Sequence, residues 1–204
     1  DTAPRHPQQQ RIVNIGDVMF DAVRHYRERV QGNLSLEELG LQHQGYALCT
    51  LHRQENTDDP VRLSAILAAL REIATHQALV LPLHPRTRAK LAQQLNANGL
   101  DGLTLLDPVP YLEMQRLQMG AHVILTDSGG MQKEAYFHGV PCITLRDETE
   151  WVETVEAGWN QLVGANEDRI LKAWRTAAVP GKIASNLFGD GRAAEKALAE
   201  LARV

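Results

Sequence analysis

Short apolar runs alternate along the chain with longer stretches in which apolar residues recur at helical spacing. The short runs are typical of strands, and the longer periodic stretches are typical of helices. The predicted strands are 11–15, 46–51, 78–83, 102–106, 122–126, 141–145 and 160–164. The predicted helices are 17–30, 60–75, 87–96, 110–119, 130–138, 167–177 and 190–203.

The predicted strands carry apolar residues on both faces, which strands with one solvated face do not. Such strands, separated by helices, indicate a parallel sheet that helices cover on both sides. We therefore expect an α/β fold with a Rossmann-like, doubly wound parallel sheet. Residues 1–10 are polar and contain proline, so we expect a linker or a ragged edge there and a single domain over 11–204.

Composition narrows the class of protein. The chain has 204 residues and a formal net charge of −4, so a basic field for a nucleic-acid partner is absent. No apolar stretch approaches the roughly 18 residues of a membrane-spanning helix, and no signal-peptide pattern opens the chain. We therefore expect a cytoplasmic protein with no membrane partner, in which Cys49 and Cys142 are reduced core residues.

Polar residues follow five of the predicted strands at the same end. They are His52, Arg53, Glu55 and Asn56; His84 and Arg86; Asp107; Asp127 and Ser128; and Arg146, Asp147, Glu148 and Thr149. Ligands of parallel α/β sheets bind outside the carboxyl ends of the strands. Loops at the opposite end, such as 75–78 and 119–122, are plainer. We therefore predict one crevice lined by five loops.

The segment Asp127-Ser128-Gly129-Gly130 stands where a predicted strand gives way to a predicted helix. Glycines let a bulky oxyanion approach the backbone, and the amides at a helix start favour phosphate. Ser128 is expected either to cap the helix or to donate its hydroxyl to the phosphate. A tight turn with a serine cap is the alternative interpretation, and it needs no ligand.

Glu134 lies one helical turn beyond Gly130, so we expect it to face the same crevice and to accept hydrogen bonds from sugar hydroxyls. Together these residues predict a nucleotide, with its phosphates on the glycines and its ribose on the glutamate. Arginines after the strands are cationic partners for a diphosphate, although each alone is more often structural. They are Arg53, Arg86, Arg88 and Arg146.

Two histidines in these loops, His52 and His84, lack the spacing of a metal site, so we expect neither a metal nor a cofactor. A positively polarised His52 that helps a phosphate to depart is the better functional interpretation. Ser128 as a hydrolase nucleophile is rejected, because D-S-G-G replaces the G-x-S-x-G motif.

Five motifs resemble, in order and spacing, the non-hydrolysing UDP-N-acetylglucosamine 2-epimerases. They are TLHRQEN (50–56), LHPRTR (83–88), LLDPVPYLEM (105–114), LTDSGGMQKEAYFHGVPCITLRDETEW (125–151) and EAGWNQLVG (156–164). The resemblance runs from about Ile12 to the final helix. It implies one half of a two-domain, glycosyltransferase-B-like fold, with this chain as the C-terminal UDP-binding domain that includes the closing helix.

The resemblance also implies chemistry and partners. The family eliminates UDP to give a 2-acetamidoglucal, and re-adds it after protonation of the opposite face at C2. The implied partners are a UDP-sugar, the missing N-terminal domain and a second copy in a homodimer.

The resemblance assigns roles to individual residues. His52 matches the catalytic histidine near the leaving diphosphate, Ser128 to Gly130 match the phosphate-binding turn, and Glu134 matches the ribose contact. The other UDP-binding residues that it implies are Arg53, His84, Arg88, Asp107, Tyr111 and Arg146, with the uracil near Asp107 to Tyr111.

Two departures from the family pattern limit what the chain does. The acidic residues that handle the C2 proton belong to the first domain, so we expect this chain alone to bind nucleotide without epimerising. Residues 149–153 read T-E-W-V-E where many members read T-E-R-P-E. The T-E-W-V-E form is similar to relatives acting on UDP-2,3-diacetamido-2,3-dideoxy-glucuronic acid, a lipopolysaccharide precursor, so the sugar stays open. Alternative functions are a UDP-sugar-dependent glycosyltransferase of the same fold and a non-catalytic nucleotide-sensing module.

Overall fold

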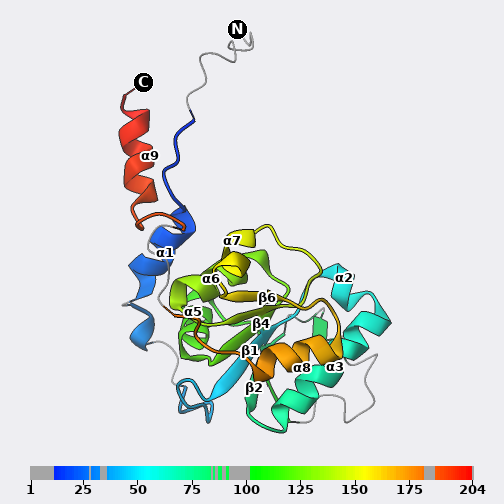
Figure 1. Cartoon of the computed structure of the whole chain (residues 1–204). Helices are drawn as coiled ribbons and strands as arrows, with labels where there is room; N and C mark the ends of the chain where they lie inside the picture. Colours follow the sequence, from blue (N-terminus) through cyan, green and yellow to red (C-terminus); the bar gives the residue numbers. More distant parts are fainter. Residues whose placement is uncertain are drawn as a thin grey trace.

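A parallel sheet forms the centre of the molecule (Figure 1). The computed structural model describes residues 12–27, 29–32, 36–83, 85, 87–88, 91, 102–181 and 187–203. Within them the sheet has six strands in the order β3-β2-β1-β4-β5-β6, and every neighbouring pair is parallel. The strands are β1 (Tyr46–Thr50), β2 (Ala78–Pro82), β3 (Leu103–Leu106), β4 (Val123–Thr126), β5 (Cys142–Thr144) and β6 (Asn160–Leu162).

Helices cover both faces of this sheet, which confirms the predicted doubly wound α/β fold. The helices are α1 (Val18–Arg27), η2 (Arg29–Gly32), α2 (Gln54–Thr57), α3 (Pro60–Ala74), α5 (Tyr111–Gly120), α6 (Gly129–His138), α7 (Val152–Glu156), α8 (Glu167–Arg175) and α9 (Ala193–Leu201). Side chains alternate along each strand, so Ala47 and Cys49 join one apolar core while Tyr46 and Leu48 join the other. Helices α3 and α8 pack on the first core, and α5 and α6 pack on the second.

The order of the strands reverses between β1 and β4. The chain builds outward from β1 through β2 to β3, then returns to place β4 on the other side of β1 and continues to β6. In an open parallel sheet such a switch point opens a crevice at the carboxyl ends of the two central strands. A ligand is therefore expected between the residues after Thr50 and those after Thr126, the ends of the two paired central strands.

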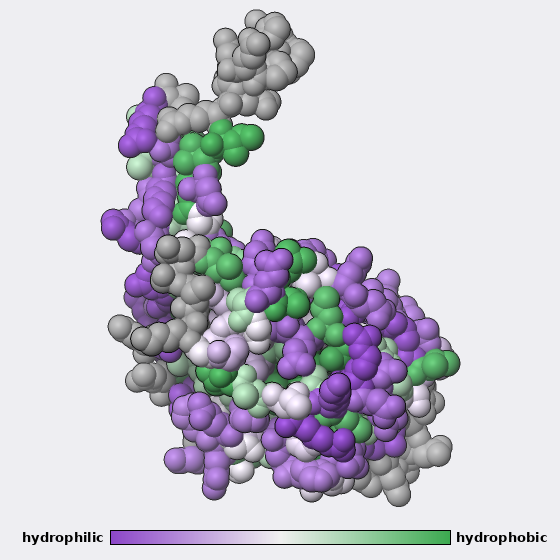
Figure 2. Space-filling view, in the orientation of Figure 1, coloured by the Kyte–Doolittle hydropathy of each residue, from purple (hydrophilic) through white to green (hydrophobic). Residues whose placement is uncertain are grey.

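The predicted strand at 11–15 is wrong for its described residues. Residues 12–17 form neither helix nor strand, and Ile12 and Val13 are 95% and 40% exposed. An apolar segment forms a strand only when it can hydrogen-bond to a neighbouring strand. This segment runs beside α9, away from the sheet (Figure 1). Figure 2 shows apolar surface on this part of the molecule. Most of the predicted helix 87–96 lies outside the described residues, and the short helices α2 and α7 were not predicted.

Both predicted core cysteines, Cys49 and Cys142, are buried thiols. Burial raises the pKa of both, that of Cys142 to about 12, so both stay protonated near neutral pH. None of the helices in the described ranges is long and apolar enough to cross a membrane.

Helix α1 packs beside α5 and α6, while helix α9 extends away from the sheet as an arm (Figure 1). Two segments cross at its base, where Gly16 and Gly189 have φ angles of 93° and 89°. A Cβ on Gly189 would lie 2.9 Å from the Cα of Gly16, so this crossing requires glycine. Above it, the Asp21 carboxylate accepts hydrogen bonds from the amides of Ala193 at 3.0 Å and Ala194 at 2.8 Å. A side chain of α1 therefore caps the start of α9.

We expect Asp21→Ala to loosen α9 without unfolding the sheet. Loss of a helix cap costs about 1 kcal/mol, which corresponds to about fivefold faster hydrogen exchange of the α9 amides. Hydrogen exchange followed by mass spectrometry measures this, with Asp168→Ala in α8 as a control that removes the same charge elsewhere. Unchanged exchange in α9 would contradict the capping role of Asp21.

Candidate functional site

Buried Asp127 holds three strand ends together. Its side chain has no exposed surface, and its carboxylate accepts hydrogen bonds from the backbone amides of His52 at 3.1 Å and Arg53 at 3.0 Å. The side-chain amide of Asn56 donates to the same carboxylate at 3.3 Å and to the carbonyl of Leu145 at 2.9 Å. The ends of β1, β4 and β5 are therefore fixed relative to one another. Sequence reasoning placed Asp127 in the crevice but gave it no role.

The His52 side chain is oriented by this carboxylate. Its Nδ1 lies 3.1 Å from Oδ1 of Asp127, while 54% of the side chain is exposed. The hydrogen bond to Asp127 raises the pKa of His52, against the smaller lowering effects of burial and the charge of Arg53. Burial by itself would raise the pKa of Asp127, but hydrogen bonds from the His52 side chain and from backbone amides lower it overall. The pair therefore favours a protonated imidazole beside an ionised carboxylate.

Helix α6 begins at the switch point, next to His52 and Asp127. Ser128 is its N-cap, with Oγ accepting from the amide of Met131 at 3.4 Å, so the capping role expected of Ser128 is confirmed. The cap does not explain the glycines. A Cβ on Gly130 would meet only Met19 and Ser128 side-chain atoms, at 3.5 and 3.9 Å, which are ordinary contacts. Gly129 is similar, with its nearest neighbour at 3.4 Å. The fold leaves room for the Cβ of an alanine at both positions, so glycine here suits an outside group that approaches the backbone.

Two of the predicted arginines converge near this helix start. Arg146 is 3% exposed, and its two terminal nitrogens bind the Glu150 carboxylate at 2.8 and 2.9 Å. Arg53 lies 4.0 Å from the same carboxylate, and Glu55 lies 3.6 Å from Nε of Arg146. The hydrogen bonds from Arg146 lower the pKa of Glu150 to about 2. Arg53 and Arg146 therefore lie together near the helix start, but in this structure their shared partner is an internal acid.

Glu134 points between α6 and α5 and is 8% exposed. The side-chain amide of Gln118 donates to its Oε2 at 2.7 Å, and burial raises the pKa of Glu134. Tyr111 opens α5, is 44% exposed, and makes an edge contact with the ring of Tyr26. Burial raises the pKa of Tyr111, and the charge of Glu134 raises it further. The ribose contact of Glu134 stays a prediction.

The remaining predicted residues lie by the end of β3 or outside the described part of the chain. Arg88 donates to the Asp107 carboxylate at 2.9 Å, so the structure pairs two residues that were predicted separately. Their side chains are 43% and 90% exposed, which leaves this ion pair largely in solvent. His84 lies outside the described residues. In the described ranges, no three His, Cys, Asp or Glu side chains are grouped to hold a metal ion.

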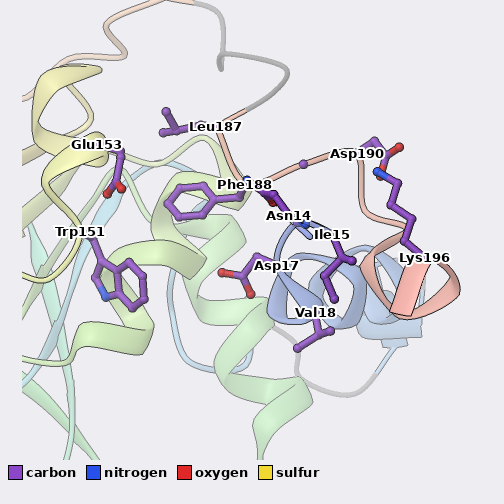
Figure 3. Close-up of a pocket in the computed structure, with 12 residues that line it drawn as sticks. Asn14, Ile15, Asp17, Val18, Trp151, Glu153, Leu187, Phe188, Asp190 and Lys196 are labelled. Atoms are coloured by element: carbon purple, nitrogen blue, oxygen red, sulfur yellow. Dashed lines mark hydrogen bonds and ion pairs between the residues drawn. The ribbon is translucent and has the colours of Figure 1, made fainter. Parts of the chain in front are cut away.

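A pocket of about 690 Å³ opens near the start of α6 (Figure 3). Its lining includes Asp17, Trp151, Glu153 and Phe188, which come from three segments far apart in the sequence. Lys133 joins two of these segments, because its Nζ lies 2.6 Å from the Asp17 carboxylate and 4.0 Å from the centre of the Trp151 ring. Trp151 was considered only as a departure from a motif, so its place beside the helix start was missed.

Known proteins resemble the chain in sequence. The sequence model of the family described as UDP-N-acetylglucosamine 2-epimerase matches residues 5–202. The UDP-2,3-diacetamido-2,3-dideoxy-D-glucuronate 2-epimerase of Pseudomonas aeruginosa is 46% identical over 199 residues, covering 95% of this chain and 53% of that protein. A UDP-N-acetylglucosamine 2-epimerase homolog of Methanococcus maripaludis is 42% identical over 190 residues, covering 91% and 53%. The chain spans about half the length of the curated relatives it matches.

Solved structures resemble the chain in fold. The UDP-GlcNAc 2-epimerase of Methanocaldococcus jannaschii, in complex with UDP-GlcNAc and UDP, matches with a TM-score of 0.82 and 36% identity. The match covers 93% of this chain and 54% of that chain. The Neisseria meningitidis enzyme bound to UDP-GlcNAc gives a TM-score of 0.81 at 28% identity, covering 98% and 57%. The chain therefore has the fold of one half of these glycosyltransferase-B-like proteins, as predicted.

We expect Asp127→Asn to lower the pKa of His52 from above its ordinary value of about 6.5 to that value or below. The amide removes the negative charge, while burial and Arg53 continue to oppose protonation. The imidazole resonances followed by NMR against pH measure this, with Asp107→Asn as a matched control distant from His52. Because the folded pKa is raised, the pair stabilises the fold most below the unfolded pKa, and this contribution is lost as pH rises through the folded pKa. An unchanged pKa in Asp127→Asn would contradict the pairing.

Proposed function

Because the chain belongs to the UDP-N-acetylglucosamine 2-epimerase family, we propose that it is the UDP-binding half of a two-domain epimerase. In this proposal residues 11–204 are the C-terminal domain with its closing helix, and residues 1–10 lead into it. The observation that carries the proposal is the start of α6 at the switch point of the sheet. There two glycines that the fold does not require adjoin a cluster of cationic groups.

The diphosphate binds, in this proposal, at the amides of Gly129 and Gly130 and the hydroxyl of Ser128. The first amides of a helix have no partner within the helix, and its dipole favours an anion there. Arg53 and Arg146 supply positive charge from the neighbouring loops. Both lie close to the carboxylate of Glu150, which itself adjoins Gly129.

His52 is the proposed catalytic residue of this half. A protonated imidazole, held by Asp127 and partly exposed, stabilises the negative charge that develops on UDP as it departs. This role matches the direction of the His52 pKa, because the charged form is the one that stabilises a leaving diphosphate.

The nucleoside lies, in this proposal, along the α5 side of the crevice. Glu134 accepts hydrogen bonds from the ribose, and the uracil lies near Asp107 and Tyr111. His84 and Arg88 complete the UDP-binding set. Glu134 accepts a hydrogen bond at 2.7 Å from Gln118 of α5, the helix that Tyr111 opens, and this contact supports a site along α5.

The proposed reaction inverts C2 of a UDP-N-acetylhexosamine. Removal of the C2 proton and cleavage of the bond from C1 to the diphosphate oxygen give a 2-acetamidoglucal and UDP. Protonation of the opposite face at C2 and re-addition of UDP at C1 complete the inversion. The groups that move the C2 proton belong to the absent N-terminal domain, so both domains, and a homodimer of the full-length protein, are the proposed working unit.

The sugar is proposed to be either UDP-GlcNAc or the diacetamido uronic acid used for lipopolysaccharide. The Pseudomonas aeruginosa relative is named for the second, at 46% identity. A glycosyltransferase is less favoured, because the relatives and neighbours described above are named as epimerases. The two reactions differ in one observable: only the epimerase exchanges the C2 hydrogen with solvent deuterium when no acceptor is present.

We expect UDP to bind the wild-type chain and Gly130→Ala to bind it at least about tenfold more weakly, because the added methyl group meets the phosphate. The variant should be as stable as the wild type, or more stable by up to about 1 kcal/mol, since alanine favours helix. Calorimetric titration and urea unfolding measure these two quantities.

The matched control is Val61→Ala, which changes an exposed residue in the first turn of α3. It should bind UDP like the wild type. Equal affinity for UDP in Gly130→Ala and the wild type would place the phosphates elsewhere.

We also expect the 204-residue chain alone to catalyse no C2 exchange in deuterium oxide with either UDP-sugar, whereas the two-domain parent does. NMR of the C2 proton reports the exchange. Exchange by the highly purified chain, free of full-length enzyme, would show that this half contains its own C2 base.

A further inference from the structure

An internal carboxylate occupies the region where the diphosphate is proposed to bind. Oε2 of Glu150 lies 3.5 Å from the position of a Cβ on Gly129, at the start of α6. The same carboxylate is held by Arg146 through two hydrogen bonds and lies 4.0 Å from Arg53. An anion between two guanidinium groups at a helix start has the surroundings that proteins offer to phosphate.

The start of α6 is surrounded by more hydrogen-bond donors than the Glu150 carboxylate accepts from. Nε1 of Trp151 is a buried atom that makes no hydrogen bond within the described residues. Nε of Arg146 makes none there either, and its nearest acid is the Glu55 carboxylate at the longer ion-pair distance of 3.6 Å. Arg146 is 3% exposed, and Nε1 of Trp151 lies 3.4 Å from the same Cβ position on Gly129. Buried donors without an acceptor are rare in folded proteins and call for a cause. A phosphate group offers more acceptor oxygens than a carboxylate, so it suits this donor set better.

Glu150 is more exposed to solvent than the arginine that it pairs with. Its side chain is 53% exposed, whereas the Arg146 side chain is 4% exposed. Two anions beside one helix start repel each other, so a bound diphosphate disfavours the observed position of Glu150. The pKa of Glu150 is lowered to about 2, so protonation near neutral pH does not remove its charge.

We propose that Glu150 stands in for the diphosphate in the ligand-free protein and that the nucleotide displaces it. Arg146 and the indole N–H of Trp151 then become further contacts to the phosphates. Glu150 thereby lowers the apparent affinity for UDP. Only the fraction of molecules in which Glu150 has moved away from Arg146 and Arg53 is competent to bind. This inference rests on the proposed function. If Glu150 were instead a fixed holder of Arg146, its removal would weaken binding, so the sign of one change separates the two roles.

The first test is the affinity for UDP of Glu150→Gln, measured by calorimetry on the whole chain. Glutamine keeps the shape and a hydrogen bond to Arg146 but removes the charge, and we expect about tenfold tighter binding. The control is Glu153→Gln, which removes the same charge at a position three residues later, in α7. We expect its affinity for UDP to stay within about twofold of the wild-type value. Unchanged or weaker binding by Glu150→Gln would overturn the inference.

The second test is Trp151→Phe, which keeps an aromatic ring beside Lys133 and removes the N–H. We expect about fivefold weaker binding of UDP, with the melting temperature recorded to confirm folding. An affinity for UDP in Trp151→Phe equal to that of the wild type would show that the Trp151 N–H does not contact the phosphates. A folded wild-type chain that binds no UDP would instead overturn the proposed function itself. A wild type that binds UDP while Glu150→Gln gains nothing overturns only the present inference.

Discussion

The buried carboxylate of Asp127 is the interaction on which the rest of the site depends. An ionised group without solvent contact is costly unless donors surround it, and Asp127 obtains them from two backbone amides and the side chains of His52 and Asn56. Those donors come from residues that follow β1, while Asp127 follows β4. The carboxylate therefore fixes the segments after these two strands relative to each other. His52 and the start of α6 are therefore held in place before any ligand arrives.

Charge in the ligand-free crevice is balanced within the chain. Arg146 and Arg53 face Glu150, with Glu55 nearby, and His52 faces Asp127. The two pairs differ in burial. Asp127 is fully buried and serves as part of the scaffold, whereas Glu150 is half exposed and is replaceable. An anionic ligand therefore enters a site whose cations are already assembled, and it exchanges with one internal anion.

The fold was predictable because its main signal is local. Strands that are apolar on both faces require helices on both sides, and polar residues after them mark the carboxyl edge of the sheet. The strand predicted at 11–15 was wrong, because an apolar pattern does not indicate whether the edge of a sheet lies near enough to pair with it. The roles of Asp127 and Glu150 were not predictable, since burial and pairing across loops arise only in the folded chain. Ser128 was foreseen as a cap because capping depends on its own neighbours.

The most direct test of the central claim is a titration of the isotopically labelled chain with UDP, followed through its backbone amide resonances. If the start of α6 holds the diphosphate, the amides of Gly129 and Gly130 shift most, and the His52 ring responds with them. Shifts confined to other surfaces, such as helices α8 and α9, would contradict a diphosphate site at the switch point of the sheet.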